Sequence, residues 1–247
     1  MLKNKKVIAI IPARGGSKRI PNKNIKLLAG KPLIYYTIRS AINSKYIDEV
    51  FVSTDSEEIA EVSKNSGAKI IQRPEELGAD DTTTVDVIKH AFDVLGKDNA
   101  ISKSDILIVL QPTSPLRVTK DIDNALELFD KSTYEENGEH CCKNVISVCE
   151  SNPYWNFVIK SDKAEPLFGW ENFRKRSQDL EKAYAVNGAI YILTGENLLR
   201  HSSLYCQDIE LFIMSKHKSV DIDDEFDFEL AELLIKERNQ EDRQIQK

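Results

Sequence analysis

Short apolar runs rich in valine and isoleucine recur along the chain, and this recurrence constrains the fold more strongly than any other feature of the sequence. Each run is only a few residues long, which suits a strand and is too short for a buried helix. Continuous apolar runs of this kind are typical of strands that are covered on both faces. The runs occupy residues 7–11, 50–53, 69–71, 106–110, 145–148, 189–193 and 211–214.

Helix-length segments with an apolar face separate the first of these runs. They cover residues 32–44, 56–65, 83–95 and 119–131. Alternation of strand and helix predicts an α/β fold with a doubly wound, mostly parallel sheet and helices on both faces. A further apolar pattern after Asp224 predicts a closing helix, and the polar segment 237–247 is expected to fray.

The alternation breaks between residues 150 and 184. This stretch holds both tryptophans of the chain and other large residues, scattered among charges without a clear period: Pro153, Tyr154, Trp155, Phe157, Phe168, Trp170 and Phe173. A long loop that covers the core is one interpretation. The number of aromatic residues outside the periodic core favours another, in which the stretch packs against a second copy of the chain and makes a homodimer.

Composition limits the partners that the chain can have. It has 247 residues, with 40 acidic side chains against 34 basic ones and a formal net charge of −6. Nucleic acids and anionic membranes attract clustered lysine and arginine, so this balance argues against both as main partners. A chain of this length can bury its core as a single domain, residues 1–247, without a metal or a disulfide.

The cysteines and the start of the chain bear on its compartment. Cys141 and Cys142 are adjacent and Cys149 and Cys206 are distant, without a Cys-x-x-Cys pair, so we expect reduced thiols rather than a zinc site or a disulfide framework. The basic start and apolar run imitate a signal peptide, but Pro12 interrupts the run too early. Apolar stretches of transmembrane length are missing. We therefore expect a cytoplasmic protein without a membrane span.

The strongest chemical signal is the loop that follows the first strand, which reads Pro12-Ala-Arg-Gly-Gly-Ser-Lys-Arg-Ile-Pro-Asn-Lys-Asn24. Adjacent glycines let backbone N–H groups approach an anion, and the clustered cations can offset the charge of a triphosphate. The loop matches neither the Walker pattern nor the dinucleotide pattern Gly-x-Gly-x-x-Gly. A phosphate cradle is favoured over a solvated turn whose basic residues only face water.

Further motifs follow in order along the chain. They are Ser53-Thr54-Asp55, Arg73-Pro74-Glu75-Glu76-Leu77, Leu110-Gln111-Pro112-Thr113-Ser114-Pro115-Leu116-Arg117, Asn187-Gly188-Ala189-Ile190-Tyr191 and Asp221-Ile222-Asp223. Together with the loop they resemble the CMP-acylneuraminate synthetases, cytidylyltransferases that activate sialic acid and related nine-carbon acidic sugars. The resemblance covers nearly the whole chain. It implies a doubly wound nucleotide-binding domain with a small inserted dimerisation element, and a reaction in which a sugar hydroxyl attacks the α-phosphorus of CTP and pyrophosphate leaves.

The resemblance also implies roles for individual residues. Those expected to bind the nucleotide are Arg14, Gly15, Gly16, Ser17, Lys18, Lys23, Asn24, Arg73 and Thr84. Three cations of this set, Arg14, Lys18 and Lys23, are expected to act in catalysis by taking up charge as pyrophosphate departs. Those expected to bind the sugar are Gln111, Asn187 and Tyr191. Without the family, a satisfied strand end would explain Gln111 and a core position would explain Tyr191.

Two aspartates near the end of the chain form the last candidate site. Asp221 and Asp223 are two residues apart, so on an extended segment both carboxylates face the same side, about 6.6 Å apart along the strand. This arrangement suits Mg²⁺, or Mn²⁺, bound by one or two carboxylates and by phosphate oxygens. Capping of the closing helix is the alternative role. The resemblance favours Asp223 as a metal ligand with a catalytic role, and Asp224 as the helix cap.

The chain departs from the family pattern at the sugar end. Many bacterial members have arginines close to the positions that Ser177 and Ala185 occupy here. The basic residues 174–176 are the nearest substitutes. The sugar therefore stays open between the N-acetylneuraminate and legionaminate types.

Other functions compete with this one. A cytidylyltransferase for a different acidic sugar, such as 3-deoxy-octulosonate, is disfavoured by the motifs that begin at Asn187 and Asp221. A regulatory module that binds a nucleotide without turnover would not need a pair of metal-binding aspartates. An NAD-dependent oxidoreductase would carry the dinucleotide pattern that the loop lacks.

Overall fold

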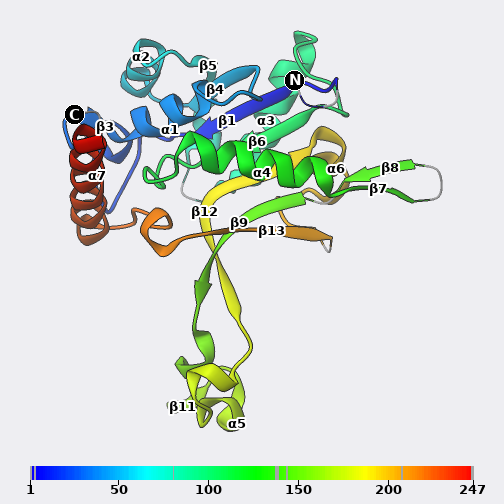
Figure 1. Ribbon diagram of the computed structural model, residues 1–247. Helices are drawn as coiled ribbons and strands as arrows, with labels where there is room; N and C mark the ends of the chain where they lie inside the picture. Colours follow the sequence, from blue (N-terminus) through cyan, green and yellow to red (C-terminus); the bar gives the residue numbers. More distant parts are fainter. Residues whose placement is uncertain are drawn as a thin grey trace.

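Figure 1 shows the computed structural model, which describes residues 2, 4–79, 81–136, 139–142, 144–206 and 208–245. A seven-stranded sheet lies at the centre of these residues, with helices on both of its faces. In spatial order its strands are β13 (Ile209–Met214), β9 (Asn144–Ser151), β12 (Ala183–Thr194), β6 (Ile106–Val109), β1 (Val7–Pro12), β4 (Glu49–Thr54) and β5 (Lys69–Gln72). Each apolar run falls on one of these strands, so the predicted α/β fold is confirmed.

The sheet is mostly parallel, as the sequence predicts, and β12 is the exception. β12 pairs antiparallel with both β6 and β9, whereas the other pairings of this sheet among the described residues are parallel. A parallel return needs a long crossover, usually a helix. The chain instead leaves β9 and comes back along it as β12, so the direction reverses at this point.

Helices cover the two faces of the sheet as two separate layers. One face packs against α1 (Leu33–Ile42), α2 (Glu57–Asn65) and α4 (Thr119–Lys131), and the other against α3 (Thr84–Lys97) and α6 (Gly195–His201). Val7, Ala9 and Ile11 of β1 enter the first apolar layer, and Ile8 and Ile10 enter the second. Because successive side chains of a strand point to opposite faces, a strand covered twice must be apolar at every position.

The closing helix, α7 (Glu225–Ile245), begins where the sequence predicts it. The Asp227 backbone N–H donates to Asp224 Oδ1 at 3.1 Å, and the Asp227 carboxylate accepts from the N–H groups of Asp223 and Asp224. Asp224 is therefore the helix cap, which confirms that assignment. The expected fraying of 237–247 is wrong as far as Ile245, because this polar segment consists largely of good helix formers such as Glu, Arg and Gln.

The excursion after β9 forms an arm, residues 152–182, that projects away from the sheet (Figure 1). Its base is a two-stranded ribbon, in which Ala183 of β12 pairs with Ser151 of β9. The arm is not an irregular loop. It contains a hairpin of β10 (Phe157–Lys160) and β11 (Lys163–Pro166), followed by the short helix α5 (Gly169–Phe173).

Aromatic rings in the arm pack on one another. The ring centroid of Phe157 lies 4.9 Å from that of Phe173 and 6.2 Å from that of Trp170, and Trp155 Nε1 donates to the Phe173 carbonyl. Even so, Trp155 is 42% exposed and Trp170 is 52% exposed. A single copy of the chain thus presents apolar surface at the tip of its arm.

Smaller elements complete the chain, and the sequence does not predict them. They are β2 (Leu27–Leu28), β3 (Lys31–Pro32), β7 (Thr133–Glu136), β8 (Glu139–Cys142) and the 3-10 turns η1 (Lys23–Ile25), η2 (Glu75–Gly78), η3 (Pro153–Trp155), η4 (Ser177–Asp179) and η5 (Lys216–Lys218). Cys149 and Cys206 are free thiols, and the side chains of Cys141 and Cys142 lie outside the described residues. None of the helices in the described part of the chain combines the length and apolar character of a membrane span.

Candidate active site

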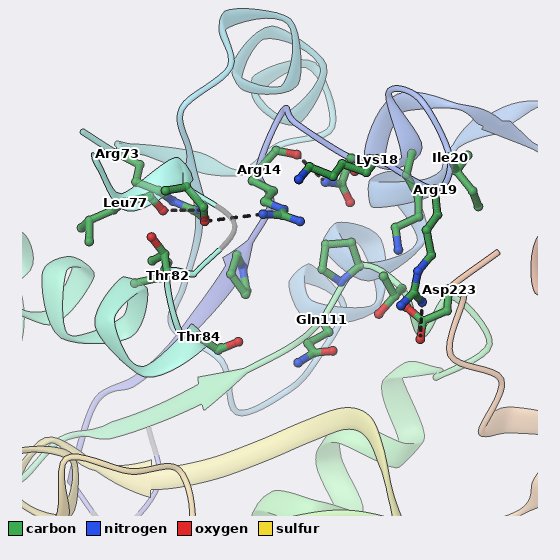
Figure 2. A pocket seen from close by; sticks show the side chains of 18 residues that line it. Arg14, Lys18, Arg19, Ile20, Arg73, Leu77, Thr82, Thr84, Gln111 and Asp223 are labelled. Atoms are coloured by element: carbon green, nitrogen blue, oxygen red, sulfur yellow. Dashed lines mark hydrogen bonds and ion pairs between the residues drawn. The ribbon is translucent and has the colours of Figure 1, made fainter. Parts of the chain in front are cut away.

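A cavity of about 580 Å³ opens where β1 and β6 end, and Figure 2 shows the side chains that line it. The predicted site residues among them are Arg14, Ser17, Lys18, Lys23, Asn24, Arg73, Thr84, Gln111 and Asp223. Arg19, Ile20 and Thr113 also line the cavity, although the family resemblance gives them no role. Most of the predicted site therefore comes together at the carboxyl edge of the sheet, where parallel α/β folds bind their ligands.

The loop after β1 is held in place by hydrogen bonds on both sides. Asp55, directly after β4, accepts the Gly15 N–H at 3.0 Å, and Asn24 Nδ2 donates to the Arg14 carbonyl at 3.0 Å. A Cβ on Gly15 would lie only 3.0 Å from Ser56 Cβ, so the close approach of loop and helix favours a glycine. Gly15 and Gly16 do not line the cavity. In this structure Gly15 allows the loop to pack closely against Ser56, and the basic side chains of the loop line the cavity.

Arg14 and Lys18 point into the middle of the cavity, with Arg73 on one side and Arg19 on the other (Figure 2). The buried Arg73 donates through Nη2 to the Ser53 carbonyl at 2.7 Å. Burial lowers the pKa of the Arg73 guanidinium, the Asp55 carboxylate acts in the opposite direction, and the positive charge of Arg14 lowers it further. Such a concentration of positive charge suits an anion with several negative groups.

Lys23 joins this loop to the segment that carries the two aspartates. Its Nζ donates to the Ile222 carbonyl at 2.7 Å, between Asp221 and Asp223. Burial lowers the pKa of the Lys23 ammonium, while the charges of Asp223 and Asp221 oppose that shift. Lys23 therefore sits between the cationic loop and the acidic pair and keeps them together.

The acidic pair has the chemistry of a weakly built cation site. The Ile222 N–H donates to the Thr113 carbonyl at 2.9 Å, which aligns the segment with the end of β6, and Asp223 pairs with Arg19 at 3.3 Å on the exposed rim. Asp221 reaches the surface, but the surrounding protein partly excludes water from its carboxyl, and this desolvation raises the pKa of the carboxyl. A hydrogen bond from Thr113 lowers that pKa, and the negative charge of Asp223 raises it.

Within the described residues, no group of three or more His, Cys, Asp or Glu side chains could hold a metal by itself. The acidic pair nevertheless fits Mg²⁺, which protein sites often bind through one or two carboxylates while substrate phosphates and water complete the shell.

Gly188 lies next to Gln111, at the carboxyl end of β6 where the cavity opens. It has a φ of +74°, and the β9–β12 pairing shifts register between Val186 and Tyr191. A Cβ at Gly188 would lie 3.1 Å from Gln111 Oε1 and 3.3 Å from Asp221 Oδ2. The absent side chain therefore leaves the space in which Gln111 and Asp221 converge.

Asn187 and Tyr191, both expected to bind the sugar, are buried and do not line the cavity. Asn187 Oδ1 accepts from Ser147 Oγ at 2.6 Å, and Asn187 Nδ2 donates to Ser219 Oγ at 2.9 Å. The Tyr191 ring packs against Tyr205, and burial raises the pKa of the Tyr191 hydroxyl. Both side chains support the strand that carries Gly188, and neither reaches the cavity.

The basic residues offered as substitutes for the missing arginines do not line the cavity of their own chain. Arg174 ends α5 and Arg176 pairs with Asp179 at 2.8 Å, both in the arm that projects from the sheet (Figure 1). Ser177 lies in the arm as well, and Ala185 lies on the ribbon at its base.

Several residues that build the site escape sequence reasoning. Asp55 and Arg117 stand in motifs, but no role follows from their sequence, because their partners are backbone groups distant in the chain. Arg19 belongs to the cationic loop, yet only the structure shows that it faces Asp223. A carboxylate directly after a strand that neighbours β1 is the one signal that points to Asp55.

The model of the cytidylyltransferase family matches residues 8–244 of this chain. The chain belongs to that family. The CMP-N,N′-diacetyllegionaminic acid synthase of Legionella pneumophila is 38% identical over 245 residues, 96% of this chain and 98% of that protein. The pseudaminic acid cytidylyltransferase of Campylobacter jejuni is 36% identical over 94% of this chain and 97% of its own length. The N-acylneuraminate cytidylyltransferase of Escherichia coli is 35% identical over 96% of this chain.

This cytidylyltransferase chain spans about half of the E. coli relative, 54% of its length. The resemblance to the CMP-acylneuraminate synthetases, predicted from the motifs, is confirmed. Among solved structures, CMP:2-keto-3-deoxy-manno-octonic acid synthetase in complex with CTP has a TM-score of 0.68 at 19% identity, covering 94% of this chain and 99% of that one. A 4-diphosphocytidyl-2C-methyl-D-erythritol synthase has a TM-score of 0.64 at 10% identity, over 94% and 100%. These likenesses confirm the fold.

Proposed function

We propose that this chain couples CTP to an acidic nine-carbon sugar and gives the CMP-sugar and pyrophosphate. The observation that carries the proposal is that one cavity combines a cationic part, around Arg14 and Lys18, with Gln111 and Asp223, while Asp221 lies near Gln111 beside Gly188. The names of relatives that match nearly end to end support the substrate class. In the reaction a sugar hydroxyl forms a bond to the α-phosphorus of CTP, the bond to the pyrophosphate oxygen breaks, and the hydroxyl gives up its proton.

In this proposal the cations of the loop bind the triphosphate and stabilise the charge that develops on the leaving pyrophosphate. Arg14 can bind phosphate oxygens through two N–H groups, whereas Lys18 and Lys23 act as point charges. As pyrophosphate leaves, negative charge moves onto it, and cations that already point there stabilise the transition state more than the ground state. Lys23 is anchored to the Ile222 carbonyl at 2.7 Å, so its position is set before the substrates bind.

Asp221 and Asp223 are the residues that would hold Mg²⁺ or Mn²⁺ in this proposal. A divalent ion bound there would neutralise phosphate charge and orient the triphosphate. The rim position of Asp223, opposite Arg19, leaves its carboxylate accessible to the substrate side of the cavity.

Nucleotide and sugar are assigned to different parts of the cavity. Arg73 and Thr84 line one end, and we assign the cytidine to it. Gln111 lines the cavity at the close of β6, and we assign the sugar to the part around it. Relatives named for legionaminic, pseudaminic and acylneuraminic acids are 35–38% identical to this chain, so the proposal is for the nine-carbon class rather than for one sugar.

We further propose that the arm joins two copies of the chain into a homodimer. The exposed rings of Trp155 and Trp170 at the arm tip support this, because a stable association buries aromatic surface of this kind. In such a dimer the basic residues 174–176 of one copy would lie near the surface of the other copy. We assign the reaction to the cytoplasm, in keeping with the free thiols Cys149 and Cys206.

Pyrophosphate release tests the function. CTP, UTP, ATP and GTP are each combined with a panel of nine-carbon acids and with 3-deoxy-octulosonate, in the presence of Mg²⁺. We expect release only with CTP and a nine-carbon acid. Release with 3-deoxy-octulosonate alone would show that the substrate belongs to a different class of acidic sugar. CTP binding without any release would show that the chain is a nucleotide-binding module without turnover.

A further inference from the structure

The ladder between β6 and β12 stops short of the cavity, and Arg117 occupies the position where it would continue. The pairing runs from Thr194 with Ile106 to Tyr191 with Val109. The same register would bring Ala189 opposite Gln111. Instead of a direct pair, Arg117 Nη1 donates to the Ala189 carbonyl at 2.6 Å and to the Gln111 carbonyl at 3.3 Å. The guanidinium thus lies between the two strand ends and bridges their carbonyl groups.

Arg117 is an unusual residue to find in this position, because it is only 2% exposed. Its third acceptor is Thr37 Oγ1 on α1, at 2.8 Å, so within the described residues its hydrogen-bond partners are backbone carbonyls and a hydroxyl rather than carboxylates. Burial lowers the pKa of the Arg117 guanidinium to about 9, partly opposed by the charge of Asp121, and it stays charged at neutral pH.

A buried charge without a hydrogen-bonded counter-ion contributes little to stability. An apolar side chain would fill the same space at lower cost, because it would not lose hydration. The residue is better explained by the geometry it imposes on its two carbonyl partners. Those carbonyls belong to Gln111 itself and to the residue directly after Gly188.

The two strand ends held apart by Arg117 carry Gln111, which lines the cavity, and Gly188, which lies beside it. Gln111 Oε1 and Asp221 Oδ2 lie 3.1 Å and 3.3 Å from the place of a Cβ at Gly188. A shift of either strand end would change the distance from the Gln111 amide to that space. A displacement of about 1 Å can lower a rate about a hundredfold when it affects how a substrate is positioned.

We propose that Arg117 is a positioning residue, which holds Gln111 and Gly188 at the separation that the acidic sugar requires. The proposal rests on the proposed function, because the sugar is assigned to the part of the cavity around Gln111. Arg117 acts from behind the wall and does not touch either substrate. Its loss should therefore impair the use of the sugar and spare the binding of CTP.

The test compares Arg117→Met, which keeps the length and apolar volume, and Arg117→Lys, which keeps the charge but replaces the planar guanidinium, whose two terminal nitrogens reach the two carbonyls and Thr37 Oγ1, by a single nitrogen. Leu126→Ala is the matched control, because Leu126 is buried in α4 against the first apolar layer and does not line the cavity. For each variant, calorimetry gives the Kd of CTP, pyrophosphate release gives kcat and the KM of the sugar, and thermal unfolding gives Tm.

Both Arg117 variants are expected to raise the sugar KM about tenfold or more and to leave the Kd of CTP within about twofold. The control is expected to lower Tm and leave both constants unchanged. Combining Arg117→Met with Gln111→Ala should add little to the effect of Gln111→Ala alone, because Arg117 acts through Gln111. Equal losses for CTP and sugar, or fully additive effects, would overturn the proposal. If the Met variant does not fold, the Lys variant decides by the same comparison.

A separate measurement keeps this test independent of the proposed function. Wild-type protein that releases no pyrophosphate with any acid would refute the proposed function. Amide hydrogen exchange then tests separately whether Arg117 holds the strand end at Ala189. In Arg117→Met the amides of Ala189 and Ile190 should exchange at least about tenfold faster, while those of Ile106 to Val109 keep their rates. Unchanged exchange at Ala189 and Ile190 would show that Arg117 does not hold the strand end.

Discussion

The loop after β1 and the arm after β9 both leave the sheet, and they are stabilised in opposite ways. The loop is polar and is fixed to the rest of its own chain through the Gly15–Asp55 and Lys23–Ile222 hydrogen bonds, with one internal bond from Asn24 to Arg14. The arm is rich in aromatic residues and is fixed mainly by contacts within itself, through ring packing such as that of Phe157 on Phe173. The comparison teaches that the loop is complete within one chain, whereas the arm leaves apolar surface that a second chain can cover.

The largest expected effect concerns the acidic pair next to the loop. Asp223→Asn should reduce turnover about a hundredfold or more while fold and CTP binding persist, because positioning and charge neutralisation at the phosphorus depend on the carboxylate and its ion. Asp224→Asn is the control, since Asn caps a helix nearly as well as Asp. Steady-state kinetics and thermal unfolding are measured on both. Normal Mg²⁺-dependent turnover in Asp223→Asn would move the metal role to Asp221.

The next effect should be confined to the arm. Trp170→Ser removes an exposed ring from the arm tip and should weaken the proposed dimer about tenfold or more, since aromatic anchors dominate such interfaces. Leu27→Ser is the control, because Leu27 is 63% exposed on β2 and lies outside the arm. Light scattering over a concentration series measures both. A wild-type chain that stays monomeric at micromolar concentration would show that the arm has another role.

Asp55→Ala should affect the loop without reaching the arm. The Gly15 N–H loses its acceptor, so the loop gains freedom that CTP binding must remove again, and we expect the Kd of CTP to rise about tenfold. Glu58→Ala, an exposed acidic position in the first turn of α2, removes the same charge without this hydrogen bond. Calorimetry distinguishes the two. A similar loss in both variants would assign the effect to net charge.

The smallest effect is a change in stability at Asp221. Its folded pKa is raised above the unfolded value, so above that pKa the ionised carboxylate destabilises the fold, and the penalty disappears as pH falls. Asp221→Asn should therefore raise Tm at pH 7, by on the order of a degree or two given solvent screening, while the difference from wild type shrinks toward pH 3. Thermal unfolding at several pH values measures this. A lower Tm at pH 7 would contradict the assignment.

Sequence reasoning predicts the elements that local patterns encode. The two-face burial of β1 appears as an unbroken apolar run, and the cap at Asp224 appears as an aspartate directly before an apolar helical pattern. The cationic loop can also be predicted from the sequence, because its glycines and basic residues are adjacent in the chain. These features depend on neighbours in sequence, so the sequence contains enough information to find them.

Features that depend on distant partners could not be predicted in the same way. The reversed direction of β12 follows from how the arm returns along β9, and an apolar run looks the same in either direction. The inward turn of Asn187 depends on Ser147 and Ser219, and the bridging role of Arg117 depends on the Ala189 carbonyl, 72 positions away. No local pattern carries that information.

The pairing of Ser151 with Ala183 has a consequence for how the chain can change over time. The two ends of the arm are neighbours on adjacent antiparallel strands, so the whole segment between them is joined to the sheet like the tip of a hairpin. A tight Asn-Gly turn could close the same gap. Insertions, deletions or exchanges of the arm can therefore accumulate without altering the register of β9 and β12. The exposed surface of the arm is free to diversify while the strands that carry the cavity keep their geometry.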